Sequence, residues 1–280
     1  MDAFRVLVVD DGLEYITCAT SWLHRGADQL PARPDVIQAG SVAEAAAAVK
    51  HCVTSGITIH AAIVDLGLGP RQPSGLGVIN LLEELSVPVA VWTDWSEGAR
   101  RLMFVYAAFS WYKPVALLPK ARFTAGTDGD HAARDFSRDI ARIYRREALS
   151  PDLAAYFRPR HGRAWPFEQV LSSRADLQKW QAFVTYSQTA AVAAHLKLRP
   201  RSIDNWLVEK YEPVWRLLDH ASGLMEIDDA DIAEPRERLR PRDGEEKQAN
   251  LDRKAALHQW ARSQSWFFND PVVSARYPAR

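Results

Sequence analysis

Five polar residues stand at the ends of short apolar runs, at positions where their side chains could meet. Asp10 and Asp11 follow the first run, Asp65 follows the third, Thr93 follows the fourth and Lys120 follows the fifth. If the runs are parallel strands of one sheet, these residues project from its carboxyl edge, where open α/β sheets place their ligand sites. The sequence therefore predicts one crevice that contains carboxylates, a hydroxyl and an ammonium group.

The residue types in this crevice are suited to phosphoryl transfer. Crowded carboxylates repel one another, and a hard divalent cation such as Mg²⁺ relieves that repulsion. Asp65 would be the nucleophile, because a carboxylate can carry a phosphoryl group as an acyl phosphate. Thr93 can donate its hydroxyl to a phosphoryl oxygen, and Lys120 can place a compact positive charge beside another. We expect Asp10, Asp11 and Asp65 to be the metal ligands.

The elements that must position these residues alternate along residues 1–147. Amphipathic helical segments separate short β-branched runs, and this alternation predicts a parallel sheet covered on both faces. The expected fold is α/β, a five-stranded doubly wound parallel sheet, followed by an all-α helix-turn-helix domain. The strands are expected at Phe4–Val9, Val36–Ala39, Ala61–Val64, Val87–Trp92 and Ala116–Leu118, and helices at Tyr15–Leu23, Val42–Cys52, Gly77–Leu85 and Ala132–Arg145.

Four motifs in order, FRVLVVDD, AAIVDLGLG, VAVWTDW and ALLPKA, resemble the receiver domain of two-component response regulators. The resemblance implies a flavodoxin-like fold, a metal-binding acid pair at Asp10 and Asp11, and a phosphoacceptor at Asp65. It also implies a switch hydroxyl at Thr93 and the family's lysine at Lys120. Thr93 follows Asp65 at the family's usual spacing, whereas Lys120 follows Thr93 at a spacing a few residues longer.

A second lysine competes for the last of these roles. Lys113 precedes Pro114, and a Lys-Pro pair also occurs in receivers. We favour Lys120, because the run Ala116–Leu118 before it makes a better buried strand.

Several positions depart from the receiver pattern. Asp94 stands where the family commonly has a small residue, so an additional carboxylate would oppose an incoming phosphate. Leu117 replaces the aromatic residue that usually precedes the lysine, bulky Trp92 and Trp95 flank the threonine, and the loop Gly67–Gly75 is longer than usual. These departures concern the mechanism by which phosphorylation would switch the domain more than they concern its fold.

The alternation ends after residue 147, and only helical patterns follow. Residues 148–165 contain Pro151, Pro159 and Gly162 and are expected to be a linker. Residues 166–222 are expected to form a helical output domain. The remainder, 223–280, is interpreted as a charged linker followed by a C-terminal helix whose role the sequence does not assign.

The segment Ser187–Leu218 predicts a helix-turn-helix: a short apolar helix face, a turn containing Pro200, and a second helix. It resembles the LuxR/GerE and sigma-region-four type over about thirty residues, without the threonine-arginine-glutamate signature that usually precedes it. If the second helix enters the major groove, its polar residues would read bases and the turn would contact phosphates. The expected DNA-binding residues are Lys197, Arg199, Arg201, Asp204, Asn205 and Lys210.

Bulk composition adds few constraints. Lys plus Arg and Asp plus Glu number 35 each, so a DNA-binding surface must be a local patch. The chain has 2 cysteines and no cluster at zinc-ligand spacing, which argues against a disulfide framework or zinc site. The first apolar run is too short for a signal peptide or a membrane span. We expect a cytoplasmic protein without membrane attachment.

Together these features predict a transcriptional regulator rather than an enzyme, because the helical half shows no paired catalytic groups, HExxH or Walker loop. A partner histidine kinase would phosphorylate Asp65 in the presence of Mg²⁺, and the change would control DNA binding by a homodimer. Two alternatives stay open: the receiver works without phosphate, or the helical half binds a protein instead of DNA.

Overall fold

The computed structural model describes residues 3–69, 72–93, 98–121, 129–159, 165–223, 230–240 and 247–278. The chain divides into two compact units, the first comprising Met1–Ser96 and Phe104–Arg158 and the second comprising Glu97–Met103 and Pro159–Arg280. No helix in the described part of the chain carries an apolar stretch of the length and hydropathy required to cross a bilayer.

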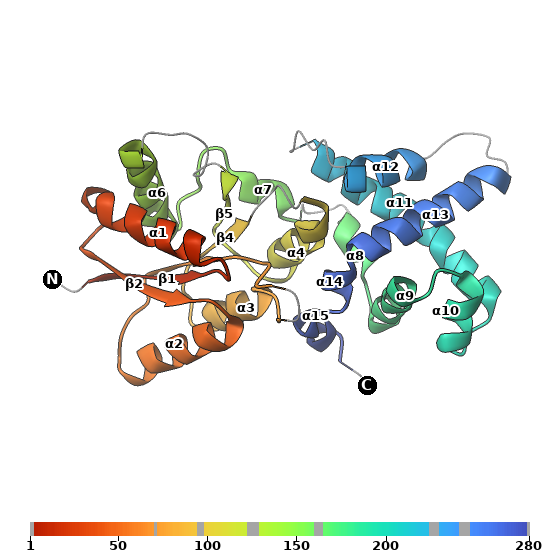
Figure 1. Ribbon diagram of the computed structural model, residues 1–280, viewed down its shortest axis with the longest axis horizontal. Coiled ribbons are helices and arrows are strands. Elements are labelled where there is room, and N and C mark those ends of the chain that lie inside the picture. The colour runs from red at the N-terminus through yellow and green to blue at the C-terminus, as the bar shows by residue number, and fades with distance from the viewer. Residues whose placement is uncertain are drawn as a thin grey trace. The chain divides into compact units, whose positions relative to one another are not determined.

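The first unit is built around a parallel five-stranded sheet in the order β2-β1-β3-β4-β5 (Figure 1). Its strands are β1 (Phe4–Val9), β2 (Pro34–Ala39), β3 (Ala61–Val64), β4 (Val89–Thr93) and β5 (Ala116–Pro119). The helices are α1 (Leu13–Arg25), α2 (Val42–Thr54), α3 (Leu76–Glu84), α6 (Gly129–Tyr144) and α7 (Leu153–Phe157), with a 3₁₀ turn at Ala27–Gln29. Helix α4 (Gly98–Trp111) belongs to this unit from Phe104 onward. The predicted α/β class and the positions of the strands are confirmed.

Both faces of this sheet are covered, as the continuous apolar strands require. Alternate strand residues, among them Val6, Val8 and Ile63, share a buried cluster with side chains of α1 and α6. The intervening residues of β1, Leu7 and Val9, are equally buried, and α2 and α3 cover the opposite face (Figure 1). A sheet buried on both sides leaves only its strand ends for polar chemistry.

The boundary between the units lies later than the sequence indicates. Helix α7 falls in the expected linker, but its Phe157 is fully buried and its ring lies 5.1 Å from that of Tyr106. Arg158 donates a hydrogen bond to the carbonyl of Val115 at 3.0 Å. Residues 148–158 therefore belong to the first unit.

The second unit contains only helices among its described residues. They are α8 (Pro166–Val170), α9 (Arg174–Thr185), α10 (Thr189–His195), α11 (Pro200–Ser222), α12 (Ala230–Leu239), α13 (Lys247–Ser263), α14 (Ser265–Phe268) and α15 (Pro271–Arg276). The all-α second half is thus as predicted.

An aromatic core joins helices that are far apart in the sequence. The ring of Trp180 on α9 lies 4.7 Å from Trp206 on α11, 5.2 Å from Trp260 on α13 and 5.4 Å from Phe268 on α14. Trp260 and Phe268 are fully buried. The segment after residue 222 is therefore more than a linker and one helix, because it supplies part of the core of this unit.

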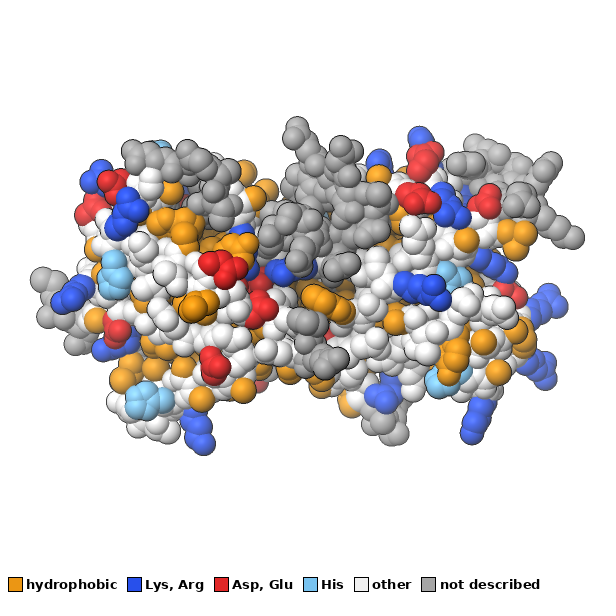
Figure 2. All heavy atoms as spheres, viewed as in Figure 1, with side chains coloured by type: hydrophobic (Ala, Val, Ile, Leu, Met, Phe, Trp, Pro, Cys, Tyr) orange, Lys and Arg blue, Asp and Glu red, His pale blue; other side chains and the backbone are white. Residues whose placement is uncertain are grey.

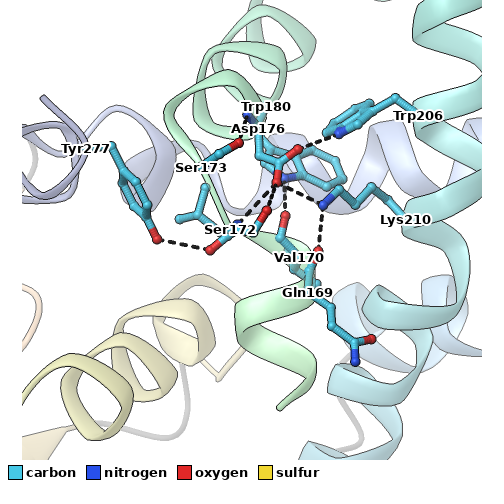
Figure 3. A network of polar contacts seen from close by, with 10 residues as sticks. Gln169, Val170, Ser172, Ser173, Asp176, Trp180, Trp206, Lys210 and Tyr277 are labelled. Atoms are coloured by element: carbon cyan, nitrogen blue, oxygen red, sulfur yellow. Dashed lines mark hydrogen bonds and ion pairs between the residues drawn. The ribbon is translucent and has the colours of Figure 1, made fainter. Parts of the chain in front are cut away.

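A buried polar network fixes α11 against α8 and α9 (Figure 3). Asp176 accepts hydrogen bonds from Ser172 Oγ at 2.7 Å and from the indole of Trp206 at 2.7 Å. Lys210 Nζ lies 3.0 Å from the same carboxylate and donates to the carbonyl of Gln169 at 2.6 Å. Burial opposes ionisation of Asp176, but the hydrogen bonds from Ser172 and Trp206 and the charge of Lys210 hold its pKa below the usual value.

Gly75 is the point at which the loop after β3 returns close to the backbone of Asp65. A Cβ atom at this position would lie 1.9 Å from the backbone oxygen of Asp65, so Gly75→Ala must displace backbone. We expect the substitution to lower the free energy of unfolding by about 2 kcal/mol or more, measured by urea denaturation. The control is Gly40→Ala, whose Cβ would meet its nearest neighbour at 3.5 Å. Equal effects of the two substitutions would contradict this view of the loop.

The pairing of Lys210 with Asp176 can be tested by substitution. Lys210→Met keeps the volume of the side chain but leaves the buried carboxylate of Asp176 without its cation, which should cost about 3 kcal/mol of stability. Lys197→Met, at an exposed position of the same unit, should change stability by less than about 0.5 kcal/mol. In the double variant Lys210→Met/Asp176→Asn, the loss should be smaller than the sum of the two single losses, because no unpaired charge remains. Additive losses would argue against coupling of the pair.

Candidate functional site

The acidic crevice forms where the sheet ladder runs one residue beyond the strands. The backbone N–H of Asp10 donates to Ala39, that of Asp65 to Val9, and that of Lys120 to Thr93, at 3.1, 2.9 and 2.9 Å. These bonds fix the Cα positions of the three charged residues at one rim of the sheet. The strand order places β1, β3, β4 and β5 side by side there.

The charged side chains meet as the sequence predicts. Carboxylate oxygens of Asp10, Asp11 and Asp65 lie within 4.8 Å of one another. Lys120 Nζ lies 2.7 Å from Asp10 Oδ2 and 3.1 Å from Asp65 Oδ2. Asp10 and Asp65 are completely buried and Lys120 is 2% exposed, whereas Asp11 is exposed. One ammonium group therefore bridges the two buried carboxylates.

Burial and charge act against each other in this cluster. Desolvation, with repulsion by Asp65, raises the pKa of Asp10 to about 6, although Lys120 and the N–H of Gly12 partly oppose the shift. Burial disfavours the charged form of Lys120, but the attraction of Asp65 and Asp10 outweighs it and raises the lysine pKa. The carboxylates thus carry more negative charge than Lys120 alone neutralises.

The donor set fits a hard divalent cation. Asp10, Asp11 and Asp65 offer oxygen atoms from three side chains within one coordination distance of each other, and Mg²⁺ prefers oxygen ligands. Gly69 makes room beside Asp11: its φ is +89°, and a Cβ would lie 3.0 Å from Asp11 Oδ2. An L side chain there would be strained and would crowd this carboxylate.

Thr93 occupies its expected place at the end of β4. It is 1% exposed, and its Oγ1 has no hydrogen-bond partner among the residues that the structure describes. A buried hydroxyl in that state has a donor free for a group that enters the crevice.

Of the two lysines that the sequence leaves in competition, Lys120 is the one in the crevice. Lys113 is exposed and lines a different, shallow pocket with Ser86, Pro114 and Arg146. Lys120 follows β5 directly and pairs with Asp65. The preference for Lys120 therefore agrees with the geometry.

The positions that depart from the receiver pattern are only partly described by the structure. Asp94 and Trp95, and Pro70 in the loop Gly67–Gly75, lie outside the described residues. Trp92 is fully buried in the cluster beneath α1 and α6, and Leu117 is 3% exposed in β5.

Sequence reasoning missed Tyr15. Its ring centroid lies 4.0 Å from Lys120 Nζ, and its ring lies edge-on to that of Trp92 at 6.0 Å. The only available signal was its place in the first turn of the helix that follows the Asp10-Asp11 pair, which is insufficient to show which way the ring points.

The predicted helix-turn-helix is present in the second unit. Helix α10 ends at His195, Lys197 adopts a left-handed conformation with φ of 56°, and α11 begins at Pro200. The N–H of Leu198 closes the turn on the carbonyl of Ala193 at 2.8 Å. A positive φ at this point is a common way to end a helix and turn sharply into the next.

The predicted DNA-binding residues divide into two groups. Lys197, Arg199, Arg201 and Asn205 are exposed on the turn and on the first turns of α11. Figure 2 shows Lys and Arg side chains at the right of the view, where Figure 1 places α10. This part of the surface offers both cations and an amide to an outside partner.

Two of the predicted DNA contacts are engaged within the protein. Lys210 is 7% exposed and bound to Asp176 and Gln169, so its assignment as a DNA contact is wrong in this structure. Its position on the helix faces the core, which its charge alone did not reveal. Asp204 is half-buried and pairs with Lys254 of α13 at 2.5 Å, which neutralises a carboxylate that would repel phosphates.

Comparisons with known proteins give little beyond this geometry. No protein-family model matches the chain, and no curated protein matches it either. Among solved structures, two RcsB dimers bound to two parallel DNAs align with 15% identity and a TM-score of 0.41, covering 73% of this chain and 88% of that one. The RcsB response regulator of Salmonella typhimurium aligns with 14% identity and a TM-score of 0.38, covering 80% of this chain and all 100% of that one. Similarities this weak do not establish a family or a function.

Proposed function

We propose that this chain is a cytoplasmic response regulator whose first unit accepts a phosphoryl group on Asp65 and whose second unit binds DNA. The observation that carries the proposal is the convergence of Asp10, Asp11 and Asp65 on one point, with Lys120 Nζ 3.1 Å from Asp65. A nucleophilic carboxylate, a metal-binding acid pair and a fixed cation are the components that phosphoryl transfer to aspartate needs.

In the proposed reaction an Asp65 oxygen attacks the phosphorus of a phosphohistidine on a partner histidine kinase. The new bond joins Asp65 oxygen to phosphorus, the bond from phosphorus to the histidine nitrogen breaks, and that nitrogen leaves with the electron pair. Asp10, Asp11 and Asp65 would hold Mg²⁺, which when bound neutralises charge on the phosphoryl oxygens. Lys120 can shift a hydrogen bond that it donates from the Asp65 carboxylate to a phosphoryl oxygen. The hydroxyl of Thr93, which has no partner among the described residues, can donate to another.

The pairing of Lys120 also supplies a way for the reaction to be sensed. Phosphorylation of Asp65 replaces a carboxylate by a bulkier group with more negative charge. Lys120 and Thr93 must then take new partners, so the ends of β4 and β5 are the first part of the fold to respond. A change there that alters the output or a homodimer contact would couple phosphate to DNA binding.

Asp65→Asn tests the nucleophile. We expect wild-type protein with acetyl phosphate and Mg²⁺ to gain one phosphoryl group by intact mass, and the variant to gain none, because an amide oxygen is a poor nucleophile. Asp35→Asn is the control, because Asp35 on β2 is an exposed carboxylate that pairs with Arg5 of β1. Labelling of Asp65→Asn at the wild-type level contradicts the assignment. DNA binding by a wild-type protein that is never labelled identifies a receiver that works without phosphate.

For the output half we propose that the N-terminal turns of α11 enter the major groove. Arg201 and Asn205 are exposed one helical turn apart, and Arg and Asn side chains can pair bidentately with guanine and adenine. Lys197 and Arg199 on the adjoining turn are placed to contact phosphates. Glu209 and Glu212 are exposed further along the helix. Their negative charge disfavours contact of this part of α11 with the DNA phosphates.

Arg201→Ala tests this surface. We expect it to weaken binding to a selected DNA site by about 1–3 kcal/mol and to relax the base preference at one position. Arg216→Ala is a matched control, because Arg216 lies on the same helix, is exposed and pairs with Glu212. Site selection from random DNA followed by mobility shifts at fixed salt provides the measurement. Affinities that are equal for both variants, or no selected site at all, would favour a protein partner for the helical unit.

A further inference from the structure

Asp65 has no solvent-exposed surface, although Asp11 at the same crevice is exposed. Asp65 and Asp10 are completely buried, and the Lys120 side chain that bridges them is almost so. Because Asp65 has no exposed surface, a phosphodonor or a water molecule must displace neighbouring side chains to reach it. The side chains that separate Asp65 from solvent therefore affect every reaction of this carboxylate.

The Tyr15 ring lies against the Lys120 side chain that bridges the two buried carboxylates. Its ring centroid is 4.0 Å from Lys120 Nζ, well within the range of a cation–π contact. The ring of Trp92 lies 5.7 Å from the same nitrogen and edge-on to Tyr15. Tyr15 is itself half-buried, so part of its side chain faces Lys120 and part faces solvent.

Gly12 shows that the local backbone accommodates the ring in this place. A Cβ atom at Gly12 would lie 2.7 Å from Tyr15 Cδ2 and 3.2 Å from Asp10 Oδ1. Any larger residue at this position would push the ring away or crowd the carboxylate. The glycine thus leaves room for Tyr15 to lie against the start of α1 and across Lys120.

We propose that the Tyr15 ring is a cover that controls access of water and small reagents to Asp65. The face of an aromatic ring attracts the ammonium group of Lys120 and excludes water from it, so the contact keeps the cover shut. Opening requires rotation of the Tyr15 side chain while the backbone of α1 stays in place. The identity of the reagent that enters rests on the proposed phosphotransfer, but the existence of the cover does not.

If the proposed phosphotransfer holds, the cover slows two steps. In phosphorylation it limits approach of the phosphodonor to Asp65. In dephosphorylation it limits the water that attacks phosphorus, breaks the phosphorus–Asp65 oxygen bond, and releases inorganic phosphate and the free carboxylate. Tyr15 acts on both steps by access and does not exchange protons with the reacting atoms.

A thiol placed at the nucleophile measures access without any phosphate chemistry. In an Asp65→Cys background the introduced thiol occupies the buried position of Asp65, so the rate of its modification reports access to that position. The probe is methyl methanethiosulfonate, and peptide mass spectrometry follows each cysteine separately. Cys52 on α2 is 3% exposed and reports on unfolding of the same unit.

We expect the introduced thiol to react slowly with Tyr15 present and at least about tenfold faster after Tyr15→Ala, as loss of a cation–π contact would allow. Tyr15→Phe retains the ring and should stay slow, and Leu13→Ala, at an exposed residue of the same helix, should have no effect. Fast modification with Tyr15 present, or equal rates for all variants while Cys52 stays protected, overturns the proposal. If Cys52 becomes reactive in the Tyr15→Ala variant, Tyr15→Leu is tested in place of Tyr15→Ala, because leucine fills volume but does not attract the ammonium group. The leucine variant must then react faster than the phenylalanine variant for the proposal to stand.

The native Asp65 protein provides the second measurement. With acetyl phosphate and Mg²⁺, Tyr15→Ala should accelerate both the gain and the loss of the phosphoryl group, and Tyr15→Phe should match wild type. Absence of labelling in wild type contradicts the proposed phosphotransfer but leaves the thiol result to decide on the cover. Labelling of wild type together with fast modification of the thiol in the Asp65→Cys background contradicts the cover alone.

Discussion

The ion pairs of Lys120 with Asp10 and Asp65 are the interaction on which the first unit depends. Two carboxylates buried at the end of a sheet would repel each other in a medium that screens charge poorly, and neither could stay ionised there alone. Lys120 reaches both, at 2.7 and 3.1 Å, because the ladder of β4 and β5 fixes its backbone on Thr93. The sheet thereby holds the Asp65 carboxylate beside a cation while leaving it no exposed surface.

The buried cluster of Asp10, Asp65 and Lys120 differs from a simple ion pair because it contains more than one carboxylate. Lys120 pairs with the carboxylates of Asp10 and Asp65, and the pKa of Asp10 is raised first by desolvation and then by repulsion from Asp65. A divalent cation bound by these carboxylates would offset their mutual repulsion. Covering Lys120 with an aromatic ring adds a second control, because it determines what reaches the unbalanced charge.

The second unit uses the same physics for a different purpose. Asp176 and Lys210 also form a buried pair, but hydrogen bonds from Ser172 and Trp206 and to Gln169 satisfy the groups around them. The effect of this network is to hold α11 against α8 and α9. The first turns of that helix are then presented with their cations exposed.

The sequence by itself determined the order of the strands' polar ends and the alternation of elements, because apolar periodicity and strand-end polarity are local properties of the chain. It was less informative where burial is complete: α4 was not among the predicted helices, since its run from Leu102 to Phe109 is buried throughout and shows no polar face. Only the tertiary structure decided that Lys210 serves the core while Arg201 faces outward, that Trp260 and Phe268 complete the helical core, and that Tyr15 lies over Lys120. Each of these depends on which distant side chain occupies the neighbouring space, and that is set by packing between elements and not by the residues beside it in the sequence.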